Sequence, residues 1–294
     1  MAASPDAVAQ DSPADGVAAD AQRLVALLAE IGPCVIAYSG GVDSAVVAQA
    51  AHLALGERAV AVTGASASLA AGELETARRI AAAIGVEHRV VATRELQSAA
   101  YLANAPDRCF HCKDELYGRL RPLASEWGLP AVVNGANADD RGDFRPGMTA
   151  AAQHAVRSPL AELGLGKSQV RQLAAHWGLE IWDKPATPCL SSRVAYGVEI
   201  TPERLARIDA AEQVLRQCGL GTVRVRCHER ELARLEVPLD ALPRLCEPQV
   251  RERIVRELRG VGFAYVTVDL EGFRSGSFAQ LVPVETLQAY DTRK

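Results

Sequence analysis

A glycine pair between a strand-like run and a helix-like run constrains the fold of this 294-residue chain more than any other feature. Residues 34–38 (CVIAY) form a short apolar run typical of a buried strand, and SGGVDS at 39–44 follows directly. Residues 45–55 then have the apolar spacing of a helix. A strand that enters a helix through a glycine loop is a common unit of α/β folds, so the junction predicts that class.

Three more strand-like runs follow, and helix-like stretches lie between them. Parallel strands need such helical crossovers, so the pattern predicts a doubly wound, mostly parallel sheet that is covered on both faces. Ligands bind at the carboxyl ends of the strands in such sheets, and this edge holds the loops after Tyr38, Thr63 and Asn134. The strand candidates are 59–63, 87–93 and 131–135, and the helix candidates are 69–85 and 113–128.

The pattern changes near residue 197, which indicates a second domain. Thr201 suits a helix N-cap, and Pro202 suits the first turn of the helix that follows, at 201–219. Residues 222–228 (TVRVRCH) alternate as a half-buried strand does. Strand candidates at 232–237 and 263–270 and a helix candidate at 248–260 complete a small α+β unit.

The first twenty residues are rich in Ala, Asp, Ser and Pro and contain no aromatic residue, which is typical of a disordered segment. We expect the first helix to begin near Ala21. The predicted organisation is a disordered lead at 1–20, an α/β domain at 21–197 and a smaller α+β domain at 198–294.

Charge and hydropathy exclude several classes of protein. The formal net charge is −4, and the first twenty residues carry four aspartates and no base, so the remainder is neutral and has no basic excess for binding nucleic acid. No apolar run reaches the roughly 18–20 residues that span a membrane. The chain also lacks the charged start and apolar core of a secretory signal, so we expect a cytoplasmic protein. Its seven cysteines are too few for a disulfide scaffold.

The SGGVDS loop has the chemistry of a phosphate site. Its glycines allow close backbone approach, and its amides and those of the next helical turn can point at phosphate oxygens. It is not a Walker motif, because no GK[ST] follows, and an ordinary glycine turn is the alternative. Asp43 would act through Mg²⁺ or by holding the loop. The six candidate ATP-binding residues are Ser39, Gly40, Gly41, Val42, Asp43 and Ser44.

This hexapeptide resembles the pyrophosphate loop of the N-type ATP pyrophosphatases, or PP-loop superfamily. The resemblance implies cleavage of ATP between its α- and β-phosphates and formation of an adenylylated substrate. It also implies that Thr63 lies near the adenine or ribose and that Gly135 lies near the phosphates. Three acidic residues after the fourth strand candidate can hold Mg²⁺ or the loop itself. They are Asp139, Asp140 and Asp143.

Three cysteines suggest sulfur chemistry. Cys109 and Cys112 form a CxxC motif, and Cys189 lies between two prolines in the segment 183–193, four residues before Arg193. Three thiolates suit a [4Fe–4S] cluster that leaves one iron open for exogenous sulfide. The alternative is an unligated CxxC pair with Cys189 alone as the reactive thiol.

Six segments together resemble the LarE family of sulfur transferases, which build a nickel-pincer nucleotide cofactor, and the resemblance covers roughly residues 21–280. They are SGGVDS (39–44), RCFHCK (108–113), NGANADDRGDFRPG (134–147), VRSPLAELGLGKSQVR (156–171), KPATPCLSSRVAYG (184–197) and FRSGS (273–277).

The LarE resemblance implies a reaction. ATP would adenylylate a carboxylate of pyridinium-3,5-biscarboxylic acid mononucleotide and release pyrophosphate, and sulfur at Cys189 would displace AMP. In one branch of the family this cysteine gives up its own sulfur. In the other, three cysteines hold an iron–sulfur cluster, and the CxxC pair favours that branch, with a sulfide source as partner. Relatives also suggest a homo-oligomer such as a hexamer.

Four arginines are candidates for the carboxylates and phosphate of this small-molecule substrate, because guanidinium binds both groups bidentately. Arg224 and Arg226 lie two apart on one strand face, where like charges repel unless an anion is shared. Solvated arginines are the alternative. The four candidates are Arg193, Arg224, Arg226 and Arg274.

Other functions would fit parts of this pattern. A PP-loop enzyme that thiolates tRNA would share the loop and the cysteines, but the chain lacks a basic surface excess. A synthetase that uses ammonia would leave the cysteines idle. A non-catalytic nucleotide sensor would bind ATP and release no pyrophosphate, and a zinc-stapled interaction domain would contain zinc.

Overall fold

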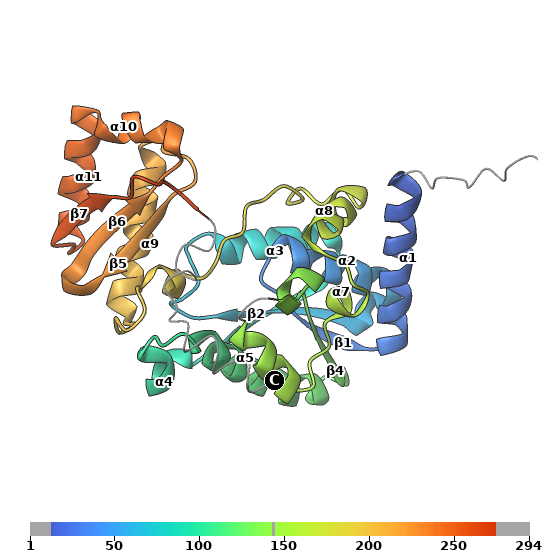
Figure 1. Cartoon of the computed structure of the whole chain (residues 1–294). Helices are drawn as coiled ribbons and strands as arrows, with labels where there is room; N and C mark the ends of the chain where they lie inside the picture. Colours follow the sequence, from blue (N-terminus) through green and yellow to red (C-terminus); the bar gives the residue numbers. More distant parts are fainter. Residues whose placement is uncertain (1–12, 143–144, 275–294) are drawn as a thin grey trace, which may run out of the picture.

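Four parallel strands form the first sheet of the computed structural model, which describes residues 13–142 and 145–274 (Figure 1). The strand order is β3-β2-β1-β4, so the first strand in the chain is central. In the register, Val35 of β1 lies opposite Val60 of β2 and Val132 of β4. The strands are β1 (Cys34–Ala37), β2 (Ala59–Ala65), β3 (Glu87–Ala92) and β4 (Ala131–Asn134).

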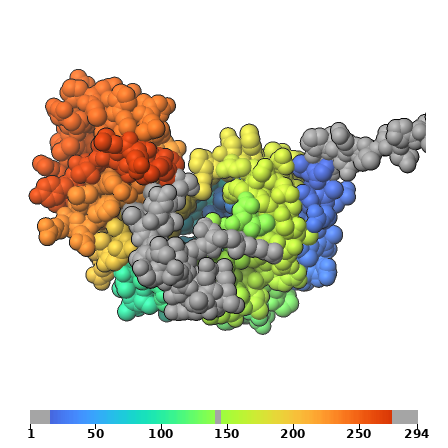
Figure 2. Space-filling model, in the orientation of Figure 1, coloured from blue at the N-terminus to red at the C-terminus, as the bar shows by residue number. Residues whose placement is uncertain are grey.

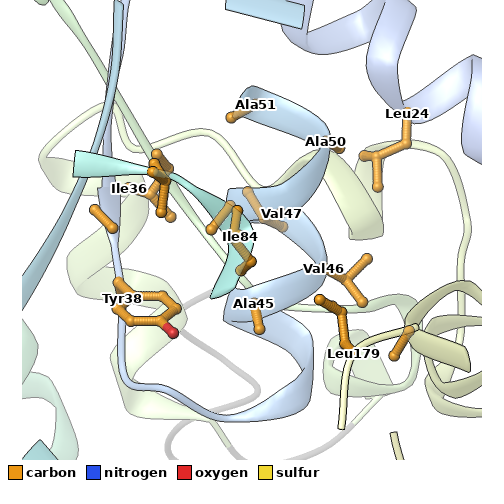
Figure 3. Packing of buried hydrophobic residues seen from close by; sticks show 14 of the residues in the cluster. Leu24, Ile36, Tyr38, Ala45, Val46, Val47, Ala50, Ala51, Ile84 and Leu179 are labelled. Atoms are coloured by element: carbon orange, nitrogen blue, oxygen red, sulfur yellow. The ribbon is translucent and has the colours of Figure 1, made fainter. Parts of the chain in front are cut away.

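Helices cover both faces of this sheet. Cys34 and Ile36 of β1 pack in one buried cluster with residues of α1, α2, α3 and α8, whereas Val35 points the other way and packs with α5 and α6. Figure 3 shows Val46 and Val47 of α2 in the first of these clusters. Because both faces are buried, β1 reads as a continuous apolar run, and the predicted doubly wound α/β class is confirmed.

The helices of this part of the chain are α1 (Pro13–Ile31), α2 (Val42–Leu55), α3 (Glu73–Ile84), α4 (Ala99–Leu102), α5 (Arg108–Glu126), α6 (Pro146–Gln153), α7 (Pro159–Glu162) and α8 (Lys167–His176).

A second sheet has three strands in the order β5-β6-β7, with β5 antiparallel and β7 parallel to β6. In Figure 2 its residues and helices, in orange and red, form a lobe beside the rest of the molecule. As predicted, Thr201 caps the first helix here, since its hydroxyl accepts a hydrogen bond from the amide of Arg204 at 3.2 Å. The elements are α9 (Pro202–Gln217), β5 (Arg224–His228), β6 (Leu232–Glu236), α10 (Leu242–Cys246), α11 (Pro248–Gly260) and β7 (Tyr265–Val268).

One asparagine joins the two parts of the chain. The side-chain amide of Asn104, which is fully buried, donates to the carbonyls of Ala195 at 2.8 Å and Val198 at 3.0 Å. The backbone carbonyl of Asn104 accepts a hydrogen bond from the backbone amide of Gly197. The segment just before the second sheet is therefore bonded to the segment that precedes α5.

Two helices begin earlier than the sequence suggested. α1 starts at Pro13 rather than near Ala21, so the expected disordered lead is wrong for residues 13–20. Proline suits the first helical position, and the alanines that follow favour the helix. α5 starts at Arg108 rather than residue 113, which places the CxxC motif on a helix and not in a loop.

In the described ranges, no helix is both long and apolar enough to cross a membrane.

Candidate active site

A pocket of about 530 Å³ lies at the carboxyl edge of the first sheet. The loops after the four parallel strands contribute to its wall, as does the N-terminal part of α5. Nine of the candidate site residues from the sequence line it, including members of the glycine loop and all three cysteines of the proposed sulfur site. They are Ser39, Asp43, Ser44, Thr63, Cys109, Cys112, Gly135, Asp140 and Cys189.

The SGGVDS loop forms a closed turn at the start of α2. The hydroxyl of Ser44 donates to the carbonyl of Gly41 at 3.1 Å and accepts from the amide of Ser39 at 3.2 Å. Gly40 has φ +72°, and a Cβ there would lie 2.8 Å from the Cα of Ala77 in α3. Both the backbone conformation and the close approach of α3 therefore require glycine at position 40.

Gly135 brings the end of β4 against the start of α2. A Cβ on this residue would lie 2.7 Å from the amide nitrogen of Ser44 and 2.9 Å from the carbonyl carbon of Asp43. These are backbone atoms that cannot rotate away. The role predicted for Gly135 near the phosphates stays a prediction, but its position beside the SGGVDS loop accounts for the absence of a side chain.

Asp43 holds neighbouring segments together. Its Oδ1 accepts from the side-chain amide of Asn137 at 3.1 Å, and its Oδ2 forms an ion pair with Lys167 at the start of α8. The backbone amide of Lys167 donates to Asp139 at 2.7 Å, and Asp140 accepts from the amide of Asn137. Asp43 was expected either to act through Mg²⁺ or to hold the loop, and its ion pair and hydrogen bond are contacts of the second kind. Asp143, the third acidic candidate after β4, lies outside the described residues.

Thr63 is buried at the end of β2. Its hydroxyl donates to the carbonyl of Tyr38 at 2.9 Å, so the Nε2–H of His88, at 2.8 Å, donates to it. Burial, and after it the charge of Arg78, lowers the pKa of His88, which favours the neutral imidazole. The position of Thr63 is therefore fixed from two sides, and its contact with a nucleotide stays a prediction.

Cys109 and Cys112 lie three residues apart on α5 and line the pocket together with Cys189. Cys109 is exposed, and the other two are half-buried. Burial raises the pKa of the Cys112 thiol to about 12, against the opposing effect of Lys113. Within residues 13–142 and 145–274, no three His, Cys, Asp or Glu side chains lie close enough to hold one metal ion.

Two cations that the sequence analysis did not single out flank these cysteines. Arg108 is buried, donates to Asn104 Oδ1 at 2.6 Å and to the carbonyl of Ser191 at 2.9 Å, and has no carboxylate partner among the described residues. Burial lowers its pKa, but the charges of Cys189, Cys109, Tyr101 and Tyr196 together outweigh this effect, so the pKa of Arg108 is raised. Lys113 also lines the pocket. Arg108 and Lys113 lie in the first two turns of α5, and their place on one helix was missed because α5 was expected to begin at residue 113.

A buried carboxylate lies in the same pocket. Glu95 follows β3 and is 2 % exposed. Its Oε1 accepts hydrogen bonds from the hydroxyls of Ser66 and Ser68, which follow β2. Sequence reasoning missed these three residues, although polar side chains directly after two neighbouring parallel strands are a usable signal.

Arg193 does not line the pocket, which corrects the substrate-binding role expected for it. Its side chain is fully buried and pairs with Glu212 of α9 at 2.9 Å. It also donates to the carbonyls of Pro188 and of Cys189, the latter at 2.9 Å. Residues 183–193, which carry Cys189, are called the cysteine loop below. Arg193 fastens this loop to α9, because a buried guanidinium needs both a counter-charge and acceptors.

Arg224 and Arg226 lie on β5 and differ in their partners. Arg226 forms a bidentate pair with Glu236 on β6, with both N–O distances 2.9 Å, and the substrate-binding role expected for Arg226 stays a prediction. Arg224 donates to the carbonyls of Val223 and Ala186 and, within the described ranges, has no carboxylate partner. Burial, and next the charge of Arg193, lowers the pKa of Arg224 to about 10.

Arg274 forms ion pairs with Glu271 and Asp269. None of the four predicted arginines belongs to the described lining of the pocket.

Comparison with known proteins places these features in a family. The asparagine synthase family model matches residues 26–125. An uncharacterised protein of Synechocystis is 45% identical over 261 residues, which is 89% of this chain and 97% of that protein. The pyridinium-3,5-bisthiocarboxylic acid mononucleotide synthase of Lactiplantibacillus plantarum is 36% identical over 254 residues, or 86% of this chain and 91% of the synthase.

A tRNA-specific 2-thiouridylase of Rickettsia africae is 27% identical over 189 residues, about half of each chain. The match to the synthase is longer and closer, and it extends over most of both proteins. The chain therefore belongs to the LarE family, the PP-loop sulfur transferases of nickel-pincer nucleotide synthesis.

Proposed function

We propose that this protein uses ATP to adenylylate a carboxylate of pyridinium-3,5-biscarboxylic acid mononucleotide and converts it to a thiocarboxylate with sulfur delivered at Cys189. One observation carries the proposal: the SGGVDS loop and the three cysteines line the same pocket. Adenylylation gives the carboxyl a good leaving group, and a sulfur nucleophile held in the same pocket then reacts without diffusing.

At the phosphate end, the amides at the start of α2 would bind the phosphates of ATP. Lys167, which pairs with Asp43 in this structure, would exchange that partner for a phosphate oxygen. Mg²⁺ usually takes one or two carboxylates together with substrate phosphates, and Asp43 and Asp140 both line the pocket, so these residues fit it. The ion would neutralise charge on the departing pyrophosphate.

At the sulfur end, Cys109, Cys112 and Cys189 would hold a [4Fe–4S] cluster. The donor set fits, because each thiolate of such a cluster binds a different iron and the sulfurs need not be close enough for a single ion. The cations Arg108 and Lys113 beside the thiols suit a group that carries negative charge. When bound, the cluster would offer one open iron to sulfide. The alternative is Cys189 as a single-use sulfur donor.

Arg224 is the best remaining candidate for a carboxylate or the phosphate of the substrate. It is a buried cation whose hydrogen-bond acceptors in the described residues are two carbonyls, and its guanidinium also lies over the ring of Phe273, 5.1 Å from the centroid. One of the two carbonyls is that of Ala186, three residues before Cys189. An anion would stabilise it more than two neutral carbonyls do. Arg274 would contribute only after leaving its pair with Glu271.

Anaerobic purification with iron and acid-labile sulfide counted per chain tests the proposal. We expect about four irons per cluster, lost on Cys109→Ala, Cys112→Ala or Cys189→Ala. Cys246→Ala is the matched control, because this cysteine is exposed and outside the pocket lining. Iron-free protein that loses the sulfur of Cys189 after one turnover would instead support the single-use route.

Pyrophosphate release that depends on the pyridinium substrate tests the adenylylation step. Release that requires tRNA would favour tRNA thiolation, the second candidate, which the match to the 2-thiouridylase supports over half the chain. If neither the pyridinium substrate nor tRNA stimulates pyrophosphate release, the protein adenylylates a different acceptor. The homo-oligomer and the cytoplasmic location stay predictions, to be tested by light scattering and by cell fractionation.

A further inference from the structure

One carboxylate oxygen in the pocket lacks a hydrogen-bond partner in the described part of the chain. The Oε2 atom of Glu95 is buried and unpartnered, whereas Oε1 accepts from Ser68 at 3.1 Å and from Ser66. Nearly all buried polar atoms in proteins are hydrogen-bonded. An unpartnered acceptor in the wall of a pocket therefore points to a ligand that brings the missing donor.

This oxygen belongs to the sulfur end of the pocket. The charge of Glu95 acts on the thiol of Cys112, and Glu95 shares the pocket wall with Cys189. The carbonyl of Ser68, whose hydroxyl holds Glu95, accepts from the amide of Leu190 at 2.8 Å, next to Cys189. One short segment after β2 thus fixes both the carboxylate and the cysteine loop.

The sulfur-transfer step releases a proton that needs an acceptor. Hydrosulfide forms a carbon–sulfur bond to the activated carboxyl, and the bond from carbon to the AMP oxygen breaks, with its electron pair leaving on AMP. The product first carries an S–H group. Thiocarboxylic acids are stronger acids than carboxylic acids, so at neutral pH the products are a thiocarboxylate, AMP and one proton. No oxidant or reductant is involved.

Resting on the proposed function, we propose that Glu95 is the proton acceptor of this step, and that its Oε2 takes the proton of the entering hydrosulfide. Ser66 and Ser68 occupy Oε1, which leaves Oε2 to the ligand. A base placed in this way typically contributes about 10²–10⁴-fold to the rate. Adenylylation itself releases no proton to this end of the pocket, so it does not need Glu95.

Glu95→Gln is the first test variant. The carbonyl of glutamine still accepts from both serines, whereas its amide nitrogen replaces Oε2. We expect thiocarboxylate formation to fall about 10²–10⁴-fold, with pyrophosphate release, ATP affinity and iron content unchanged. Hydroxylamine added at high concentration would trap the acyl adenylate as hydroxamate, and because its adduct can lose its proton to solvent, this reaction should run at the wild-type rate.

Glu75→Gln is the matched control, because it makes the same substitution at a carboxylate of α3 that is 77% exposed and lies outside the pocket lining. We expect thiocarboxylate formation in this variant to stay within about twofold of the wild type, which would assign the loss in Glu95→Gln to the pocket carboxylate. Should Glu95→Gln lower the melting temperature, Glu95→Asp keeps a carboxylate and should transfer sulfur faster than the glutamine variant.

Two results would overturn the inference while leaving the proposed function standing. One is a thiocarboxylate rate in Glu95→Gln equal to that of the wild type. The other is an equal loss of thiocarboxylate, hydroxamate and pyrophosphate, which would make Glu95 a structural residue. If the wild-type protein forms neither hydroxamate nor pyrophosphate with the pyridinium substrate, both the proposed function and the role of Glu95 are wrong.

Discussion

Gly135→Ala is a single methyl group added at the contact between β4 and α2. The new Cβ would lie 2.7 Å from the amide nitrogen and 2.9 Å from the Cα of Ser44. Carbon atoms need well over 3 Å, and all the atoms concerned are backbone. The start of α2 and the end of β4 therefore have to move apart by several tenths of an ångström.

This displacement has two measurable consequences. Overpacking a tight contact destabilises a protein by about 1–3 kcal/mol. If the movement also misaligns one amide that binds a phosphate, the loss of a hydrogen bond to a charged group weakens ATP binding by about 1.5–3 kcal/mol, or roughly 10- to 150-fold.

Urea unfolding and equilibrium binding of ATP on the same preparations measure both effects. Gly118→Ala in α5 is the control, because its Cβ would meet only the side chain of His154, at 3.7 Å. Replacing glycine by alanine in an exposed helix should stabilise this variant by about 1 kcal/mol. Wild-type stability together with ATP affinity within twofold in Gly135→Ala would refute the argument from close approach.

Three further predictions follow from buried groups. Arg193→Met leaves buried Glu212 with Arg216, whose side chain is 42% exposed, as its remaining counter-charge, so the free energy of unfolding should fall by up to about 3–5 kcal/mol in urea titrations; unchanged stability would mean that Arg193 has no structural role. In reduced, iron-free protein, iodoacetamide should label exposed Cys109 before Cys112, whose pKa burial raises to about 12, and peptide mass mapping that finds the reverse order would contradict this. Burial lowers the pKa of His88 below 6.5, so the unfolded chain takes up the proton first, and stability falls as the pH drops from 6.5 toward the folded-state pKa. His88→Gln should flatten this part of a stability-against-pH curve.

The first sheet could be predicted because its strands carry local signals. β1 and β4 are apolar on both sides, and glycine or a helix-like run marks where they end. The expected strands differ from the observed ones by two residues at most at each end. Since the loops after parallel strands meet at one edge, the pocket residues Ser39, Thr63 and Gly135 followed from the same pattern.

The arginines show what local pattern cannot supply. Arg193 and Arg226 find their counter-charges on Glu212 and Glu236, which lie 19 and 10 residues away in sequence. Whether an arginine meets such a partner or a ligand depends on how helices and strands pack. The early start of α5 has a similar origin, because Cys112 packs against the core cluster of the second part of the chain.

The contacts of Arg193 also bear on how this protein can evolve or be recombined. The loop that carries Cys189 depends on a helix that follows it in sequence, since Glu212 supplies the charge on which Arg193 relies. Grafting residues 183–193 alone into a distant relative would bury a guanidinium without its carboxylate. The loop and α9 should therefore be inherited as one module, and a chimera joined between them should fold only if the recipient already has an acid at the position of Glu212.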